Sequence, residues 1–305
     1  MANFNVNGIR AAERRGFTAW LQECEADVIT LQEVRCPVES LPEGIFGDYH
    51  LLYDSGSRAG RNGVAVLTRE APAAVRSWGA TVLHRHRGGE LELPFDRATR
   101  LARGMNGWAA EGRYLEVDLA ERPVTVASLY LPKGGLPAEL QIPGRMREKP
   151  DGGAAHDRKI AFLDAFSRQL THARRRAREA GRHFLLTGDL NIAHLNQDVT
   201  NWRSNGKSPG FLPHERAWID GVIGPRRLVD VLRKLHPESD GPYSWWSWMG
   251  QSFDKNVGWR VDYQLADPAL ATLASAAFVD RAATAEQRVS DHAAVVVDYN
   301  LPRTG

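Results

Sequence analysis

Carboxylate and carboxamide side chains stand where apolar runs of this chain end. The run in HFLLTGDLNIAH (183–194) leads to Asp189 and Asn191, and DVITLQ (27–32) is followed directly by Glu33. A single carboxylate in such a place is usually a turn residue or a helix cap. Several together indicate more, because carboxylate oxygens bind Mg²⁺ or Mn²⁺ and amide groups can hold a phosphate.

Polar residues that suit the same chemistry occur in further stretches of the chain. They are Asn5 and Asn7 in FNVNG, Tyr130 at the end of VASLY, Asp262 in WRVDYQLA, and Asp291 with His292 before AAVVV. A histidine with a carboxylate partner can be oriented and charged. If these strand ends meet at one rim of paired sheets, they form a metal-assisted phosphodiesterase site.

The elements that must position these residues are mixed strands and helices. RYLEVDLA (113–120) alternates with the period of a half-buried strand, and apolar runs at 27–32, 63–68, 124–131 and 293–299 predict further strands. The stretches 14–26 and 157–181 have helical spacing, and 132–153 reads as a long Pro- and Gly-rich loop. Without a strict βαβ alternation, this order favours two packed sheets covered by helices in a single domain, residues 1–305.

Composition limits the class of protein without naming a substrate. The chain has 305 residues, of which 43% are apolar and 25% charged, and its net charge is only +2. Two cysteines are too few for a disulfide framework and fit a reducing compartment. No apolar run predicts a membrane span or a signal peptide, so we expect a cytoplasmic protein. The arginines between 174 and 182 are expected to form a solvated helix end.

Six motifs occur in an order that is typical of a known family. NVNGIRA, LQEVR, YLPKG, GDLNIA, RVDYQLA and SDHAAV resemble the exonuclease III family of apurinic/apyrimidinic (AP) endonucleases, within the DNase-I-like, or endonuclease/exonuclease/phosphatase, superfamily. The resemblance runs from Asn5 to about Tyr299. It implies an α/β fold of the DNase-I-like kind, a four-layer sandwich of two mixed β-sheets flanked by helices. It also implies a Mg²⁺-dependent DNA repair enzyme, with Mn²⁺ as the alternative ion, that cleaves 5′ to abasic sites and trims 3′ ends as a 3′→5′ exodeoxyribonuclease.

The resemblance also assigns a metal site. It makes Glu33 a principal ligand of the catalytic ion, with Asn7 close by and Asp291 supporting a metal position. Asp189, Asn191 and His292 complete the expected metal set. Whether one ion or two act, and which group is the base, stays open at this point.

The roles in catalysis follow from the same resemblance. Asp189 would align or deprotonate the attacking water, and Asn191 would hold the scissile phosphate. His292 would contact a phosphate oxygen, and Asp262 would orient its imidazole. Two residues lie around the phosphate in this scheme, Tyr130 beside the leaving group and Asn5 in the phosphate-binding network.

Two segments favour nucleic acid as the substrate. NWRSNGKSPGFLPHERAW (201–218) resembles the family and supplies Arg203 and Lys207 as phosphate contacts. In YSWWSW (243–248), Trp245, Trp246 and Trp248 could wedge into the minor groove or stack at a lesion. Core packing is the other interpretation, and we expect it to hold for at least one of the three. The expected partner is double-stranded DNA with abasic sites or 3′ ends, bound by a monomer away from membranes.

Two rival functions and two departures accompany this prediction. The rivals are a DNase-I-like phosphodiesterase with a non-nucleic-acid substrate, and a catalytically inactive DNA-binding member, against which the complete acidic set argues. Only four residues precede Asn5, so the first strand looks clipped and the true start may lie upstream. The segment 81–108 does not match the family core, and its His84 and His86 are expected to be solvated in an Arg-rich loop rather than metal ligands.

Overall fold

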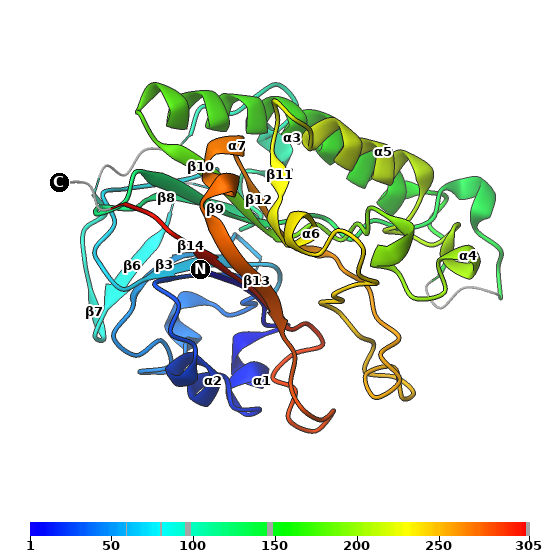
Figure 1. Ribbon diagram of the computed structural model, residues 1–305, viewed down its shortest axis with the longest axis horizontal. Coiled ribbons are helices and arrows are strands. Elements are labelled where there is room, and N and C mark those ends of the chain that lie inside the picture. The colour runs from blue at the N-terminus through cyan, green and yellow to red at the C-terminus, as the bar shows by residue number, and fades with distance from the viewer. Residues whose placement is uncertain (59, 80, 95–98, 145–148, 303–305) are drawn as a thin grey trace.

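The computed structural model describes residues 1–302 other than 59, 80, 95–98 and 145–148. In this part of the chain the strands form two mixed sheets that pack face to face (Figure 1). The eight-stranded sheet has the order β13-β14-β1-β2-β4-β3-β6-β7, with β1 (Ala2–Asn5), β2 (Val28–Gln32), β3 (His50–Asp54), β4 (Val64–Thr68), β6 (Leu83–His86), β7 (Gly89–Glu90), β13 (Ala274–Asp280) and β14 (Ala294–Tyr299). The six-stranded sheet has the order β11-β12-β10-β9-β8-β5, with β5 (Ala74–Ser77), β8 (Tyr114–Asp118), β9 (Val124–Tyr130), β10 (His183–Asp189), β11 (Val229–Asp230) and β12 (Asp262–Ala266).

Helices cover the outer face of each sheet, which confirms the expected four-layer sandwich (Figure 1). The eight-stranded sheet carries α1 (Ile9–Glu13) and α2 (Phe17–Glu23), and the six-stranded sheet carries α3 (Ala154–Glu179) and α5 (Pro213–Val222). Shorter helices are α4 (Trp202–Asn205), α6 (Val231–Leu235) and α7 (Pro268–Thr272), with 3₁₀ turns at Val38–Ser40, Asn106–Trp108, Ala138–Leu140 and Asn196–Asp198. In the described part of 132–153, only the turn at Ala138–Leu140 is helical, as expected for a loop.

The prediction of a half-buried strand at 113–120 is wrong, because both faces of β8 are buried. The polar face lies under α3, where the Tyr114 hydroxyl donates to Glu116 Oε1 at 2.6 Å and Arg176 forms an ion pair with Glu116. Arg176 is therefore not part of a solvated helix end. Arg182 is not either, since its guanidinium donates to the carbonyl of Val124 at 3.1 Å.

The space between the sheets changes from apolar to polar along the strands. Valines and other apolar side chains of both sheets fill most of it, and polar side chains take their place in the last residues of the strands. Gln32 Nε2 donates to Asn3 Oδ1 at 2.9 Å and to Ser128 Oγ of the opposite sheet at 3.0 Å. Thr187 Oγ1 likewise donates to Thr30 Oγ1 across the sheets at 2.7 Å. These bonds fix how the two sheets are aligned where the polar strand ends meet.

Gly188 of β10 lies unusually close to the backbone of the neighbouring strand β9. Its φ is 149°, and a Cβ atom there would lie only 1.9 Å from the carbonyl oxygen of Leu129 on β9. No side chain fits so close to a neighbouring backbone. The glycine in GDLN therefore allows β10 to run beside β9 up to Asp189.

Candidate active site

Three predicted site residues form one row across the end of the six-stranded sheet. Asp189 ends the central strand β10 and pairs with Tyr130 of β9 on one side and Asp262 of β12 on the other. Residues that pair directly across neighbouring strands point to the same face of a sheet. The buried run 184–188 thus ends in a carboxylate because that carboxylate is the middle of a three-strand polar row.

The other sheet adds residues to this row from the ends of β1 and β2. Asn5 is buried, and its Nδ2 donates to Asp189 Oδ2 at 2.9 Å. Glu33 follows β2 directly and accepts a hydrogen bond from Tyr130, whose pKa lies well above its usual range because of burial and the charges of Glu33 and Asp189. The phenol is therefore protonated at neutral pH. Residues separated by more than 180 positions in the sequence meet in one buried cluster.

His292 and Asp262 form the expected dyad. His292 Nδ1 lies 2.8 Å from Asp262 Oδ2, which also accepts a hydrogen bond from Ser244 Oγ at 2.7 Å. Burial alone would lower the pKa of His292, but the charge and hydrogen bond of Asp262, followed by Asp189 and Asp291, raise it to about 10. The imidazole is therefore a cationic donor at neutral pH, held in direction by Asp262.

Asp189 has the properties of a proton acceptor near neutral pH. Burial raises its pKa, His292 opposes the rise, and Asp262 and Glu33 add to it, so that the pKa is about 7. Oδ1 accepts the backbone N–H of Asn191 at 2.8 Å, and Oδ2 accepts the Asn191 side-chain amide at 3.1 Å. A carboxylate with this pKa can take a proton from water at neutral pH, which is what a general base requires.

The expected metal ligands outside this row are linked to one another by hydrogen bonds. Arg35 forms an ion pair with Glu33 and donates to Asn7 Oδ1 at 2.8 Å, and Asn7 Nδ2 donates to Asp291 Oδ1 at 2.8 Å. Trp245 Nε1 donates to the other oxygen of Asp291 at 3.1 Å. Within the described ranges, no three His, Cys, Asp or Glu side chains already surround one metal position.

The chemistry of these donors nevertheless fits a divalent cation. Of the four carboxylates Glu33, Asp189, Asp262 and Asp291, two pair directly with a cation in the described part of the chain, Glu33 with Arg35 and Asp262 with His292. Asp189 and Asp291 accept hydrogen bonds from the neutral amides of Asn5 and Asn7. One buried oxygen, Asp262 Oδ1, has no hydrogen-bond partner in the described part of the chain. Hard oxygen ligands with excess negative charge are typical of Mg²⁺ sites, whereas the set contains no thiolate.

The aromatic loop divides into three different roles. Trp246 is only 1% exposed, and its indole packs on Phe253 and donates to Asn256 Oδ1 at 3.0 Å. The assignment of Trp246 to DNA contact is therefore wrong. Trp246 is the tryptophan of the three that was expected to pack in the core. Trp245 is half-buried against Asp291, whereas Trp248 is 41% exposed.

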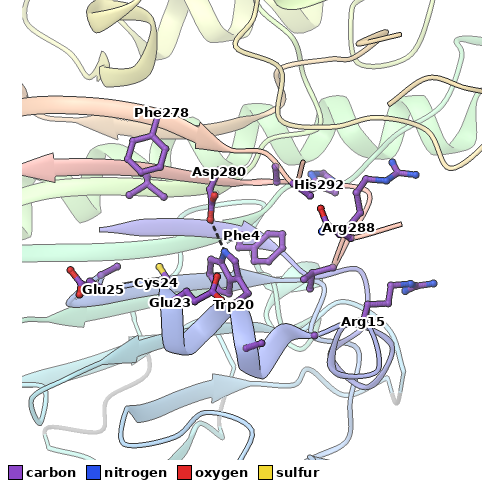
Figure 2. A pocket seen from close by; sticks show the side chains of 18 of the residues that line it. Phe4, Arg15, Trp20, Glu23, Cys24, Glu25, Phe278, Asp280, Arg288 and His292 are labelled. Atoms are coloured by element: carbon purple, nitrogen blue, oxygen red, sulfur yellow. Dashed lines mark hydrogen bonds between the residues drawn. The ribbon is translucent and has the colours of Figure 1, made fainter. Parts of the chain in front are cut away.

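A groove of about 1000 Å³ begins beside His292 and runs between α2 and the strands β13 and β14. Figure 2 shows His292, Arg288 and Arg15 at one end of the groove and Glu23 and Glu25 at the other. The guanidinium groups of Arg15 and Arg288 lie 4.8 and 4.0 Å from the ring centre of Trp248. Arg203 and Lys207 are exposed in the segment 201–218.

The sequence analysis did not identify the cations Arg15, Arg35 and Arg288, nor the buried ion pair that supports the site. Lys159 and Glu215 are almost fully buried, with Nζ and Oε1 2.7 Å apart. Lys159 Nζ also donates to the carbonyl of Asn191 at 2.8 Å, which holds the turn after Asp189. A lysine in a helix usually faces solvent, so only the proximity of Glu215 in the fold reveals this role.

Comparison with known proteins decides the family. A model described as the Endonuclease/Exonuclease/phosphatase family matches residues 2–292. The chain belongs to this family. Its members are hydrolases, and its nucleases depend in general on a metal ion.

Individual relatives and neighbours agree with this family. An exodeoxyribonuclease of Bacillus subtilis (strain 168) is 26% identical over 305 residues, which are 99% of each chain. A DNA-(apurinic or apyrimidinic site) endonuclease of Dictyostelium discoideum is 25% identical over 86% of this chain, which spans 60% of that longer protein. A solved structure of a variant of the 3′ phosphatase NExo from Neisseria, bound to a product DNA hairpin, has a TM-score of 0.74 at 22% identity and covers 98% of both chains. The fold is thus DNase-I-like. None of the described helices combines the length and the apolar composition of a membrane span.

Proposed function

We propose that this protein is a Mg²⁺-dependent DNA repair phosphodiesterase that cleaves duplex DNA on the 5′ side of abasic sites and trims 3′ ends, with Mn²⁺ as an alternative ion. One observation carries the proposal. Asp189, a carboxyl group with a pKa of about 7, lies in one buried cluster with Asn5 of the other sheet and beside the paired His292 and Asp262. Phosphodiester hydrolysis needs two such groups, an acceptor for a proton and a cationic donor for an oxyanion.

Each residue has a distinct part in this reaction. A divalent ion held by Glu33, Asn7 and Asp291 would neutralise the phosphate and stabilise the departing 3′ oxygen. Asp189 takes a proton from the attacking water. His292 donates to a phosphate oxygen through the ring nitrogen that does not contact Asp262.

The residues around the base hold it in place and border the phosphate. Asn5 and Asn191 both donate to Asp189, so their amides fix the carboxylate beside the phosphate position. Tyr130 stays protonated and supplies a phenol donor near the leaving group. Asp189 and Asn191 border the ion, whereas the cationic His292 has no lone pair for it and faces the phosphate instead.

DNA is the proposed substrate because of the relatives and the groups beside the site. The Bacillus relative is named an exodeoxyribonuclease and the Dictyostelium relative an AP-site endonuclease. Arg203 and Lys207 are exposed cations suited to backbone phosphates, and exposed Trp248 can stack at a lesion. Abasic nucleotides offer no base to read, so binding is expected to depend on backbone contacts and to weaken with salt. We expect the protein to act as a cytoplasmic monomer.

A substrate panel tests the proposal. Purified protein with Mg²⁺ is given an abasic duplex, an intact blunt duplex, a duplex with a 3′ phosphate, and sphingomyelin as a lipid phosphodiester. We expect cleavage of the abasic duplex and removal of the 3′ phosphate, both abolished by EDTA and by Asp189→Asn. Hydrolysis of sphingomyelin with no cleavage of the abasic duplex would overturn the assignment. Tight binding of the abasic duplex without cleavage at any Mg²⁺ or Mn²⁺ concentration would indicate the inactive alternative.

A further inference from the structure

Three histidines share one face of the neighbouring strands β3 and β6, at the edge of the eight-stranded sheet. The antiparallel register pairs Leu51 with Arg85, and the rings of His50, just before Leu51, and His86, just after Arg85, stack with centres 4.0 Å apart. His84 lies on the same face as His86, because residues two apart in a strand point the same way. The expectation of solvated histidines in a loop is wrong, since His84 is on a strand and only 4% exposed.

Two of these rings already present nitrogen atoms at the spacing that one metal ion requires. His50 Nδ1 lies 3.2 Å from His84 Nε2. Around a tetrahedral zinc ion with Zn–N bonds of 2.0–2.1 Å, neighbouring nitrogen ligands are roughly 3.3 Å apart. A small rearrangement of either ring would therefore replace the nitrogen–nitrogen contact with a shared ion.

The surroundings of His84 turn the lone pair of Nε2, the nitrogen in contact with His50, toward the shared position. Its other nitrogen, Nδ1, lies 3.2 Å from the carbonyl oxygen of Glu92, which can only accept a hydrogen bond. Nδ1 therefore carries the hydrogen, and Nε2 has its lone pair available toward His50. Histidine ligands of metals almost always donate their second ring N–H to a carbonyl or carboxylate in this way.

His86 supplies a third nitrogen with no present partner. Its Nδ1 is buried, and no hydrogen bond reaches it from the described part of the chain. Buried polar atoms of this kind normally have a partner, an ordered water or an ion. As the rings now lie, no three such side chains in the described part of the chain are placed to hold one metal ion. The ring of His86 must turn out of its stack on His50 to bring a nitrogen to the shared position.

We propose that His50, His84 and His86 form a transition-metal site of the Zn²⁺ type that ties β6, the neighbour of the edge strand β7, to β3. Imidazole nitrogens suit Zn²⁺ and related ions, whereas Mg²⁺ prefers oxygen ligands. A water molecule would complete a tetrahedral set. None of the three residues belongs to the candidate active site, so the proposed ion is structural and independent of the hydrolytic reaction.

Zinc titration of the full chain tests this site. Metal-free protein is titrated with Zn²⁺ by calorimetry in excess Mg²⁺, and its melting temperature is measured with and without Zn²⁺. We expect one zinc ion to bind and Tm to rise by about 5 °C when free zinc exceeds Kd by about a hundredfold. His50→Gln, His84→Gln and His86→Gln should each weaken zinc binding at least tenfold.

Two control variants locate the ion. His156 and His214 form another histidine pair, with Nε2 atoms 3.0 Å apart, so His156→Gln should leave zinc binding unchanged, and so should Glu33→Gln in the candidate active site. Unchanged zinc affinity in His86→Gln, or its loss in His156→Gln or Glu33→Gln, would overturn the three-histidine site. If His84→Gln fails to fold, the half-exposed His50 and His86 decide the question, provided that their metal-free variants melt as the wild type does.

Discussion

Replacing Asp262 by asparagine should change the pH dependence of the reaction as well as its rate. In the wild type the imidazole of His292 is held 2.8 Å from Asp262, and its pKa is raised to about 10 although burial alone would lower it. The rise above the ordinary value of 6.5 corresponds to roughly 5 kcal/mol of preference for the cationic form, to which Asp262 is the largest favourable contributor. Asparagine keeps the shape but removes the charge.

We expect two measurable consequences in Asp262→Asn. The rate constant kcat should fall on the order of a hundredfold, as for the loss of one preorganised donor at a transition state. The alkaline limb of the kcat/KM profile should move to lower pH by two units or more, because the imidazole now loses its proton near or below neutral pH. A bound divalent ion lowers the pKa values that define both limbs of the profile. The quantity to compare is therefore the shift between Asp262→Asn and the wild type.

The assay is cleavage of a labelled abasic duplex in Mg²⁺ from pH 5.5 to 9.5, with Ser244→Ala as the matched control. Ser244 donates to the same carboxylate oxygen at 2.7 Å and accepts from the backbone N–H groups of Val261 and Asp262, so the control removes these hydrogen bonds but leaves the charge of Asp262. Its alkaline limb should stay close to that of the wild type. If the profiles of Asp262→Asn and the wild type superimpose, with kcat values within a factor of three, the assigned role of the dyad is refuted.

Three further outcomes follow from the same structure. Wild-type kcat/KM should rise with pH through a midpoint no higher than about 7. Burial raises the pKa of Asp189 to that value, and a bound cation favours its ionised form. An activity that is constant from pH 5 to 8 would contradict the role of Asp189 as the base. Gly188→Ala should lower Tm by several degrees and reduce cleavage at least tenfold, since the new Cβ would lie 1.9 Å from the Leu129 carbonyl oxygen. Thermal melting measures the first effect and the abasic-duplex assay the second. Wild-type values for both would exclude this close approach. Lys159→Met should lower the free energy of unfolding by about 3–5 kcal/mol because it leaves the Glu215 carboxylate buried without its cation. In urea denaturation, the double variant Lys159→Met, Glu215→Gln should recover part of this free energy. An equal loss in the single and the double variant would contradict the ion-pair explanation.

The strand ends that deliver site residues were predictable because burial patterns end sharply at polar residues. The runs before Glu33, Tyr130 and Asp189 are strands in the structure, and the helical spacing at 157–181 corresponds to α3. What local patterns could not supply is register between distant strands. That Asp189 lies between Tyr130 and Asp262 depends on long-range pairing, for which the sequence carries no local signal.

Side-chain burial in loops and helices was harder to predict for a related reason. The spacing of the aromatic loop does not distinguish buried Trp246 from exposed Trp248, because the difference arises from packing on Phe253. The alternation at 113–120 indicated one solvated face, yet α3 covers it with Arg176. In both cases tertiary contacts overrode a local pattern.

The position and chemistry of the cut on a duplex with one abasic site test the central claim most directly, that both sheets together build one metal-assisted hydrolytic site. With Mg²⁺ we predict a single break on the 5′ side of the lesion that leaves a 3′ hydroxyl and a 5′ deoxyribose phosphate. Asp189→Asn and Asn5→Ala, one from each sheet, should both slow this cut strongly. An unbroken duplex, a break on the 3′ side, or full activity in Asp189→Asn would contradict the account.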